Sequence, residues 1–208
     1  MIQVGGTTPA GNAGGVVNLS KGGRVNLSKS KPGLKHIMVG LGWDVAKYSG
    51  QADFDLDASV FMVNEHGRTP VEGFVFYNNL NGPDGSVVHQ GDNRTGAGDG
   101  DDEQIFIDLE KIPAWCQKIA ITVTIDAWRE RNQSFGMVEN AFCRLVNNDT
   151  DTEEVRFDLG DDFSMETAVV IGEIYKKDGD WRFNAVGQGF NNGLEGLVNN
   201  YGLQAVYE

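Results

Sequence analysis

Residues 118–126 read KIAITVTID, and this stretch gives the clearest indication of the fold class. Its apolar part has about the length of one buried strand, and its isoleucines, valine and threonines are β-branched residues that favour strands. The run is much shorter than the roughly 18 apolar residues that are needed to span a bilayer. We therefore predict a buried strand in a soluble protein.

Runs of the same kind lie on both sides of this strand and are separated by Gly, Asn, Asp and Pro. They are LKHIMVGL (34–41), FDLDASVFMV (54–63), GFVFYN (73–78), SVVHQ (86–90), QIFIDL (104–109), ENAFCRLVN (139–147), EEVRFDL (153–159), TAVVIGEIYK (167–176) and DWRFNAV (180–186). This pattern predicts an all-β fold, an antiparallel β-sandwich of about ten or more strands with few short helices. One short helix is expected in residues 191–202, between Asn192 and Gly202, and a turn or two in residues 108–116.

The N-terminal region contains a leader and a short duplication. Residues 1–15 hold five glycines and one proline but no aromatic residue, so we expect a flexible leader. VNLSK occurs at 17–21 and again at 25–29, a pattern typical of two short strands around a glycine turn. Residues 16–208 are expected to form a single domain, since a chain of this length suits one core.

The charge of the chain is strongly acidic and unevenly distributed. The net charge is −13, and residues 44–110 hold 14 Asp or Glu against three Lys or Arg. Nucleic acids are bound through clustered basic residues, so the composition argues against a nucleic-acid partner. Two cysteines are too few for a disulfide scaffold, and the N-terminus lacks the features of a signal peptide. We expect a cytoplasmic protein.

The first group of potential metal ligands lies in ADFDLDAS (52–59). Asp53, Asp55 and Asp57 alternate with apolar residues, so a strand would place the three carboxylates on one face, roughly 7 Å apart. No Lys or Arg occurs between residues 48 and 67 to balance them. The compensating charge is therefore either a metal ion or a basic residue that is distant in the sequence.

The second group lies in the glycine-rich stretch HQGDNRTGAGDGDDEQ (89–104). Its oxygen-bearing candidates are Asp92, Asn93, Asp99, Asp101, Asp102 and Glu103. Glycines let backbone carbonyls turn inward around a hard cation, and Ca²⁺ accepts about six to eight oxygen ligands. The stretch does not fit an EF-hand, because Arg94, Gly96 and Ala97 occupy positions where that loop needs ligands and a glycine. We predict an irregular Ca²⁺ loop between strands.

Two weaker groups carry an alternative interpretation as ordinary turns. In YNNLNGPDGS (77–86), Asn78 and Asn79 are either ligands or turn residues. In FDLGDDFSMET (157–167), Asp161, Asp162 and Glu166 belong either to a solvated loop or to a second metal site.

Catalytic motifs are weak, and we expect no enzyme. The chain has no G-x-S-x-G elbow and no G-K-[ST] phosphate loop, and its three histidines suit ordinary strands or turns. A hydrolase that uses the metal or paired carboxylates is the alternative, as is a calcium-dependent module for small ligands.

The chain resembles the TerD family of bacterial tellurium-resistance and stress-response proteins. The resemblance rests on the following segments and on their order: VNLSKGGRVNLSK, PGLKHIMVGLGWD, DFDLDASVFM, FVFYNN, HQGDNRTGAGDGDDEQIFIDLEKIP, IDAWRERNQSFGMVENAFCRLVN and DLGDDFSMETAVVIGEIYKKDGDWRFNAVGQGF. It covers about residues 16–195.

The resemblance implies a β-sandwich that binds two Ca²⁺ ions, without an established catalytic activity. It also implies that the protein works in cytoplasmic complexes with other stress-response proteins. Through these partners it would associate peripherally with the inner membrane. The implied metal ligands are Asp55, Asp57, Asn78, Asp92, Asn93, Asp101, Asp102 and Glu103. Further candidates for the second site are Asp53, Asn79, Asp99, Asp161, Asp162 and Glu166.

Overall fold

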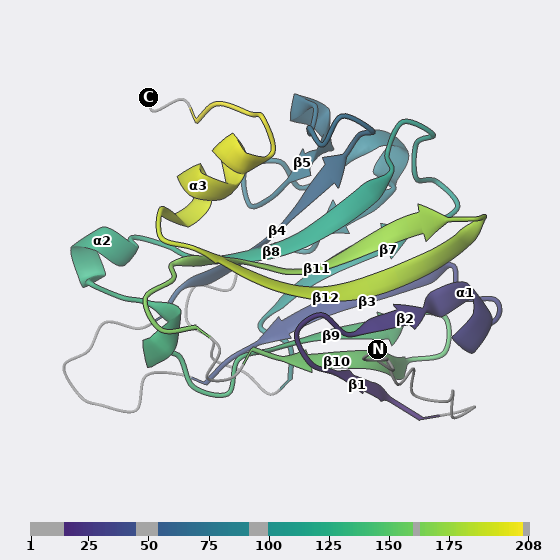
Figure 1. Ribbon diagram of the computed structural model, residues 1–208, viewed down its shortest axis with the longest axis horizontal. Coiled ribbons are helices and arrows are strands. Elements are labelled where there is room, and N and C mark those ends of the chain that lie inside the picture. The colour runs from purple at the N-terminus through teal and green to yellow at the C-terminus, as the bar shows by residue number, and fades with distance from the viewer. Residues whose placement is uncertain (1–14, 45–53, 92–99, 160–162, 206–208) are drawn as a thin grey trace, which may run out of the picture.

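Two six-stranded sheets pack face to face in the computed structural model, which describes residues 15–44, 54–91, 100–159 and 163–205 (Figure 1). Sheet A has the order β1 (Val17–Leu19), β10 (Thr152–Asp158), β9 (Phe142–Asn147), β3 (His36–Gly42), β7 (Glu103–Asp108) and β6 (Val87–His89). Sheet B has the order β2 (Arg24–Asn26), β12 (Asp180–Phe190), β11 (Ala168–Lys177), β8 (Lys118–Ile125), β4 (Leu56–Val63) and β5 (Phe74–Val75). The predicted β-sandwich is confirmed.

Each of the ten predicted runs contains one strand, and every strand pair except one is antiparallel. The exception is β1, which runs parallel to β10. KIAITVTI forms β8, which lies inside sheet B between β11 and β4. Seven of its eight residues are buried, in agreement with its apolar sequence.

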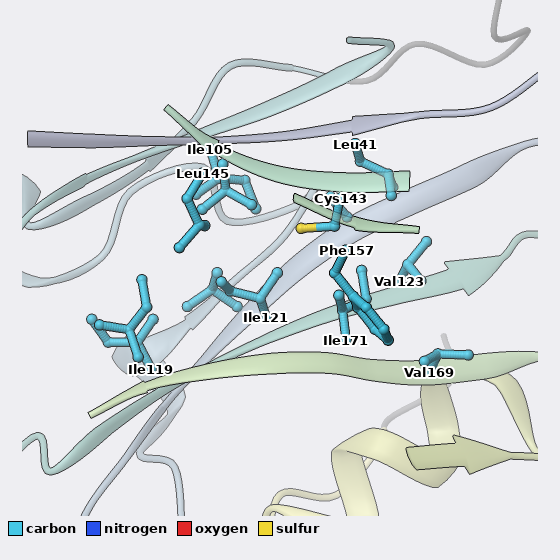
Figure 2. Close-up of a cluster of buried hydrophobic side chains, with 14 of the residues drawn as sticks. Leu41, Ile105, Ile119, Ile121, Val123, Cys143, Leu145, Phe157, Val169 and Ile171 are labelled. Carbon is cyan, nitrogen blue, oxygen red and sulfur yellow. The ribbon is translucent and has the colours of Figure 1, made fainter. Parts of the chain in front are cut away.

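The main core fills the space between the sheets. In Figure 2, Leu41, Cys143 and Leu145 of sheet A face Ile121 and Ile171 of sheet B. Each of these side chains is at most 2% exposed. Burial of this kind contributes roughly 25 cal/mol per Å² of apolar surface, so the contact between the sheets is the main stabilising feature of the fold.

The duplicated VNLSK segments form an N-terminal clasp, which we define as residues 17–30. The two strands do not pair as a local hairpin: β1 joins sheet A and β2 joins sheet B. In the second copy the chain leaves β2 and enters α1 (Leu27–Ser30), because the side chain of Asn26 accepts a hydrogen bond from the Lys29 amide at 3.0 Å. The clasp thus connects one edge of each sheet.

The helices are short, and the longest covers the outer face of sheet B. It is α3 (Gly193–Asn200), which packs Leu197 and Val198 into a second apolar cluster with Phe61 and Phe74. This confirms the helix predicted in residues 191–202, although Asn192 makes no side-chain capping hydrogen bond. The other helices are α2 (Trp128–Arg131) and the 3₁₀ turns η1 (Val71–Gly73), η2 (Pro83–Gly85) and η3 (Phe135–Met137). None of the helices in the described ranges is long and apolar enough to cross a membrane.

The register of the strands brings most of the acidic segments to one end of the sandwich, which we call the loop end. In sheet A, Gly42 pairs with Phe142 and Leu41 with Glu103. In sheet B, Leu56 pairs with Ile125. The two sheets meet at this end, where the Ala58 amide of β4 donates a hydrogen bond to Glu103 of β7.

Candidate metal centre

The predicted ligands that the structure describes occupy several distinct places. They are Asp55, Asp57, Asn78, Asp101, Asp102 and Glu103, together with the second-site candidates Asn79 and Glu166. Asp53, Asp92, Asn93, Asp99, Asp161 and Asp162 lie outside the described residues. The assignments to these fourteen positions therefore stay predictions, and the geometry of the eight described residues is given below.

Asp102 lies between the ends of β3 and β7 in a group of carboxylates. Its amide donates to the carbonyl of Leu41 at 2.8 Å, and its Oδ2 accepts from the Trp43 amide at 3.0 Å. Burial raises the pKa of the Asp102 carboxyl, and the carboxylates of Asp101 and Asp44 raise it further against the effect of the Trp43 hydrogen bond. Burial is thus the largest cause of the raised pKa, and the two neighbouring carboxylates add to it.

Asp44 is a member of this group that sequence reasoning missed. It lies two residues after the end of β3, and its Oδ2 accepts a hydrogen bond from Asn140 at 2.6 Å. The sequence did contain a signal, since an acidic residue at the end of a buried strand is a candidate for any site at that end.

Asp101 is bound by a basic side chain. Arg144 of β9 donates to both of its oxygens, from Nε at 2.7 Å and from Nη2 at 2.9 Å, and it also contacts Glu153 at 3.1 Å. Asp101 lies directly over Gly40, where a Cβ atom would overlap its carboxylate. A bidentate pair of this kind is a strong charge-assisted contact, so the charge of Asp101 is already balanced in this structure.

Glu103 points into the sandwich instead. Its Oε2 accepts from the Ala58 amide at 2.5 Å and lies 3.6 Å from Nε2 of His89. Because the Gly91 amide donates to Nδ1 of His89, we assign the proton of that ring to Nε2, which donates to the Ala58 carbonyl at 3.1 Å. This buried group holds the two sheets together at the loop end.

Asp55 and Asp57 lie on the outer face of sheet B, and the predicted alternation of this segment is observed. Leu56 and Ala58 enter the main core, whereas Asp57 lines a hollow of about 220 Å³ together with Thr124. Both carboxylates are more than nine-tenths buried. A concentration of buried carboxylates at one place suits a cation.

Residues that follow β8 complete this second carboxylate group. Asp126 lies beside Asp55, since its amide donates to the Asp55 carbonyl at 2.8 Å, and Glu130 of α2 lines the same hollow as Asp57. Arg131 contacts Asp55 at 3.9 Å and Asp126 at 3.8 Å, distances that give a weak pairing. Sequence reasoning missed Asp126 and Glu130, because only the pairing of β8 with β4 brings them to Asp55 and Asp57.

The asparagines of YNN belong to a tight turn. Phe76 and Asn79 exchange two backbone hydrogen bonds, and the Asn79 side chain donates to the Phe74 carbonyl at 2.6 Å. Asn78 is exposed and lines an apolar hollow beside α3. The turn interpretation therefore accounts for the contacts of Asn79.

The carboxylate of Glu166 binds the backbone of the turn that directly precedes it. Its Oε2 accepts from the amides of Ser164 and Met165 at 2.7 and 3.0 Å, and these hydrogen bonds lower the pKa of its carboxyl. These contacts favour the interpretation of this segment as an ordinary loop.

A further group of potential metal ligands lies at the opposite end of sheet A. Single ligand atoms of His36, Asp108 and Glu110 lie within 4.8 Å of one another. Lys111 contacts Asp108 at 3.0 Å, and Lys35 contacts Glu110 at 2.7 Å. Because lysines already balance both carboxylates, we place no metal centre there.

The two cysteines have the properties of core residues. Burial raises the pKa of Cys116 to about 11 and that of Cys143 to about 12. A thiol with such a pKa is protonated and poorly reactive at neutral pH, so neither side chain is suited to handle an oxyanion or a metalloid.

Comparisons with known proteins agree on one family. The TerD domain matches residues 16–201. YceE of Bacillus subtilis is 58% identical over 189 residues, which are 90% of this chain and 98% of that protein. General stress protein 16U of Bacillus subtilis is 49% identical over 189 residues, with the same coverage. The tellurium resistance protein TerD of Serratia marcescens is 52% identical over 190 residues, which are 91% of this chain and 98% of that protein.

A solved structure shows the same fold. It is the crystal structure of a homologue of telluride resistance protein TerD, SCO6318 from Streptomyces coelicolor A3(2), with a TM-score of 0.66. It is 22% identical to this chain and covers 78% of it and 94% of its own chain. The family match over most of the chain and the similarity to these relatives lead to one conclusion: the chain belongs to the TerD family.

Proposed function

We propose that this protein binds calcium through the carboxylates of the loop end and acts as a calcium-dependent sensor or scaffold in the stress response. Two relatives bear the names general stress protein and tellurium resistance protein, which support the physiological setting. The calcium part rests on the carboxylates that the fold gathers at one end. The observation that carries it is the grouping of Asp102 with the carboxylates of Asp101 and Asp44 at the ends of β3 and β7, since carboxylate oxygens that lie close together are the ligands that a hard cation accepts.

Two groups of carboxylates match the two ions that we expect. Asp102 and Asp44 would hold one ion, and Asp101 would join them only if Arg144 released it. Asp55, Asp57 and Asp126 would hold the other ion. Calcium would supply positive charge that neutralises these acids and orders the strand ends.

The reactive side chains among the described residues support a binding role without catalysis. Both cysteines are buried and protonated, and His89 uses both ring nitrogens within the bonded group at Glu103. We propose that the protein works in the cytoplasm with other stress-response proteins and reaches the inner membrane only through them. Its acidic charge makes nucleic acid an unsuitable partner.

Calorimetry with Ca²⁺ and with Mg²⁺ tests the proposal on the full chain and on Asp102→Asn. The asparagine keeps an oxygen for the Trp43 amide and removes only the charge, so we expect calcium affinity to fall on the order of tenfold or more. Glu65→Gln is the matched control, because Glu65 lies in an exposed turn away from the loop end and should leave affinity unchanged. Absence of binding heat, with an unchanged thermal midpoint in calcium and in chelator, would refute calcium binding.

A further inference from the structure

An apolar groove runs along α3 on the outer face of sheet B. We define the α3 groove as the hollow of about 540 Å³ between η1, the segment 74–79, α3 and residues 203–205. Figure 1 shows α3 beside β5, the two-residue edge strand of sheet B. A volume of this size is typical of ligand sites in proteins.

The walls of the groove carry exposed apolar side chains. Val71 is 76% exposed and Tyr77 is 39% exposed. Beneath them lies a stack of aromatic rings, in which the centroids of Phe74 and Phe76 are 4.2 Å apart. Leu194 of α3 forms the facing wall. Aromatic and aliphatic walls of this kind are where a few side chains of a partner gain most of the binding energy.

The charged side chains in and beside the groove are mainly acidic. The lining contains no Lys, Arg or His among the residues that the structure describes, and its single charged residue is Glu195. At its α2 side the groove adjoins the smaller hollow of Asp57, with which it shares Tyr77, Leu194 and Glu195. That hollow adds Asp57, Asp126 and Glu130. Its one cation among the described residues, Arg129, lies over the ring of Trp128 at 4.9 Å.

We propose that the α3 groove binds a segment of a partner protein that combines bulky apolar residues with lysine or arginine. The apolar side chains fill the space between Phe76 and Leu194, and the basic side chains meet Glu195 and Glu130. Opposite charges on the two surfaces select such a segment over an acidic one and accelerate its encounter with the groove. This inference goes beyond calcium binding, because the apolar walls of the groove contain none of the aspartates that we assign to the metal.

Selection from a random peptide library displayed on phage tests the proposal, with the full chain as bait in chelator. We expect the enriched sequences to combine Leu, Phe or Val with Lys or Arg. The Val71→Asp variant, used as bait in the same way, should fail to recover these sequences. Met165→Asp is the matched control, because Met165 is 72% exposed but lies outside the groove, and it should recover the same sequences as the parent protein.

The affinity of one recovered peptide then measures the charge contribution. We expect Glu195→Lys to weaken binding on the order of tenfold and Glu65→Lys to leave it unchanged. Enrichment of acidic peptides, or identical recovery by Val71→Asp, would overturn the proposal. So would a dimer in sedimentation velocity that Val71→Asp abolishes, since the occupant would then be a second copy of the chain.

Discussion

Arg144 performs in this structure a task that a metal ion performs in many acidic sites, since it balances the carboxylate of Asp101. The side chain of Asp101 is fully buried, and the guanidinium holds both of its oxygens. Removal of the Arg144 side chain would leave the buried charge of Asp101 without its main partner. The resulting loss of unfolding free energy is larger than the net stabilisation that the intact pair contributes.

We therefore predict that Arg144→Leu destabilises the protein by about 3 kcal/mol, toward the low end for a buried pair because Arg144 is itself partly exposed. Urea unfolding in chelator measures this change. The double variant Asp101→Asn/Arg144→Leu should recover part of the loss, because the buried charge is gone. Equal stability of the single variant and the parent protein would show that the pair contributes nothing.

Asp102 allows a prediction about pH. Because its pKa is raised in the folded protein, folding disfavours its ionised form, and its contribution to stability falls as pH rises through the folded pKa. In chelator, Asp102→Asn should therefore melt at a higher temperature than the parent protein at pH 7. The difference should disappear below about pH 3, where the carboxyl is protonated in both states. A lower melting temperature of the variant at pH 7 would contradict this electrostatic account.

The two thiols provide a test of burial. The pKa of Cys116 is raised to about 11 and that of Cys143 to about 12, so both remain protonated at pH 8. We expect Ellman's reagent to react with neither thiol in the folded protein and with both after unfolding in guanidinium. Fast reaction of one thiol under native conditions would show that its part of the core opens.

At the scale of elements, the short runs of strand-forming residues separated by Gly, Asn, Asp and Pro predicted every strand from β3 to β12. The duplication VNLSK predicted two short strands around a glycine turn, and β1 and β2 confirm them, but the local pattern did not indicate that the two strands join different sheets. Identical pentapeptides take different structures there, because the first copy meets β10 and the second meets β12 and then enters α1. Partners that lie more than a hundred residues away are invisible to local patterns.

The clasp should contribute measurably to stability through Leu27. This side chain is 1% exposed in the main core, so Leu27→Ala should cost about 2 to 5 kcal/mol of unfolding free energy. Leu80→Ala, at a residue that is 39% exposed, is the matched control and should cost far less. Denaturant unfolding of both variants would decide whether the clasp is part of the cooperative fold.

For the whole molecule, the sequence predicted that acidic segments would gather but not which faces their side chains would occupy. The strand period placed Asp55 and Asp57 on one face correctly. Nothing local indicated that Glu103 would turn inward to Ala58 or that Arg144 would reach Asp101. Both contacts depend on the register between distant strands, and a register is set by the complete core.

The net charge of −13 should make stability depend on ionic strength. Repulsion between acids at the loop end opposes folding, and salt screens it over distances of about 8 Å at physiological ionic strength. We expect the melting temperature in chelator to rise with added sodium chloride and to rise less when calcium is present. If the melting temperature depended equally on salt in chelator and in calcium, calcium would not be neutralising the charges of the loop end.

The clasp also has a consequence for the time course of synthesis. Val17 pairs with Val155, and Asn26 pairs with Arg182, so β1 and β2 leave the ribosome long before their neighbours β10 and β12. Until β10 and β12 have emerged, the nascent chain carries two β-edges without partners, a state in which chains of this kind are prone to aggregate. Closure of the clasp would then report that translation has passed β12, because both β10 and β12 must be present for it.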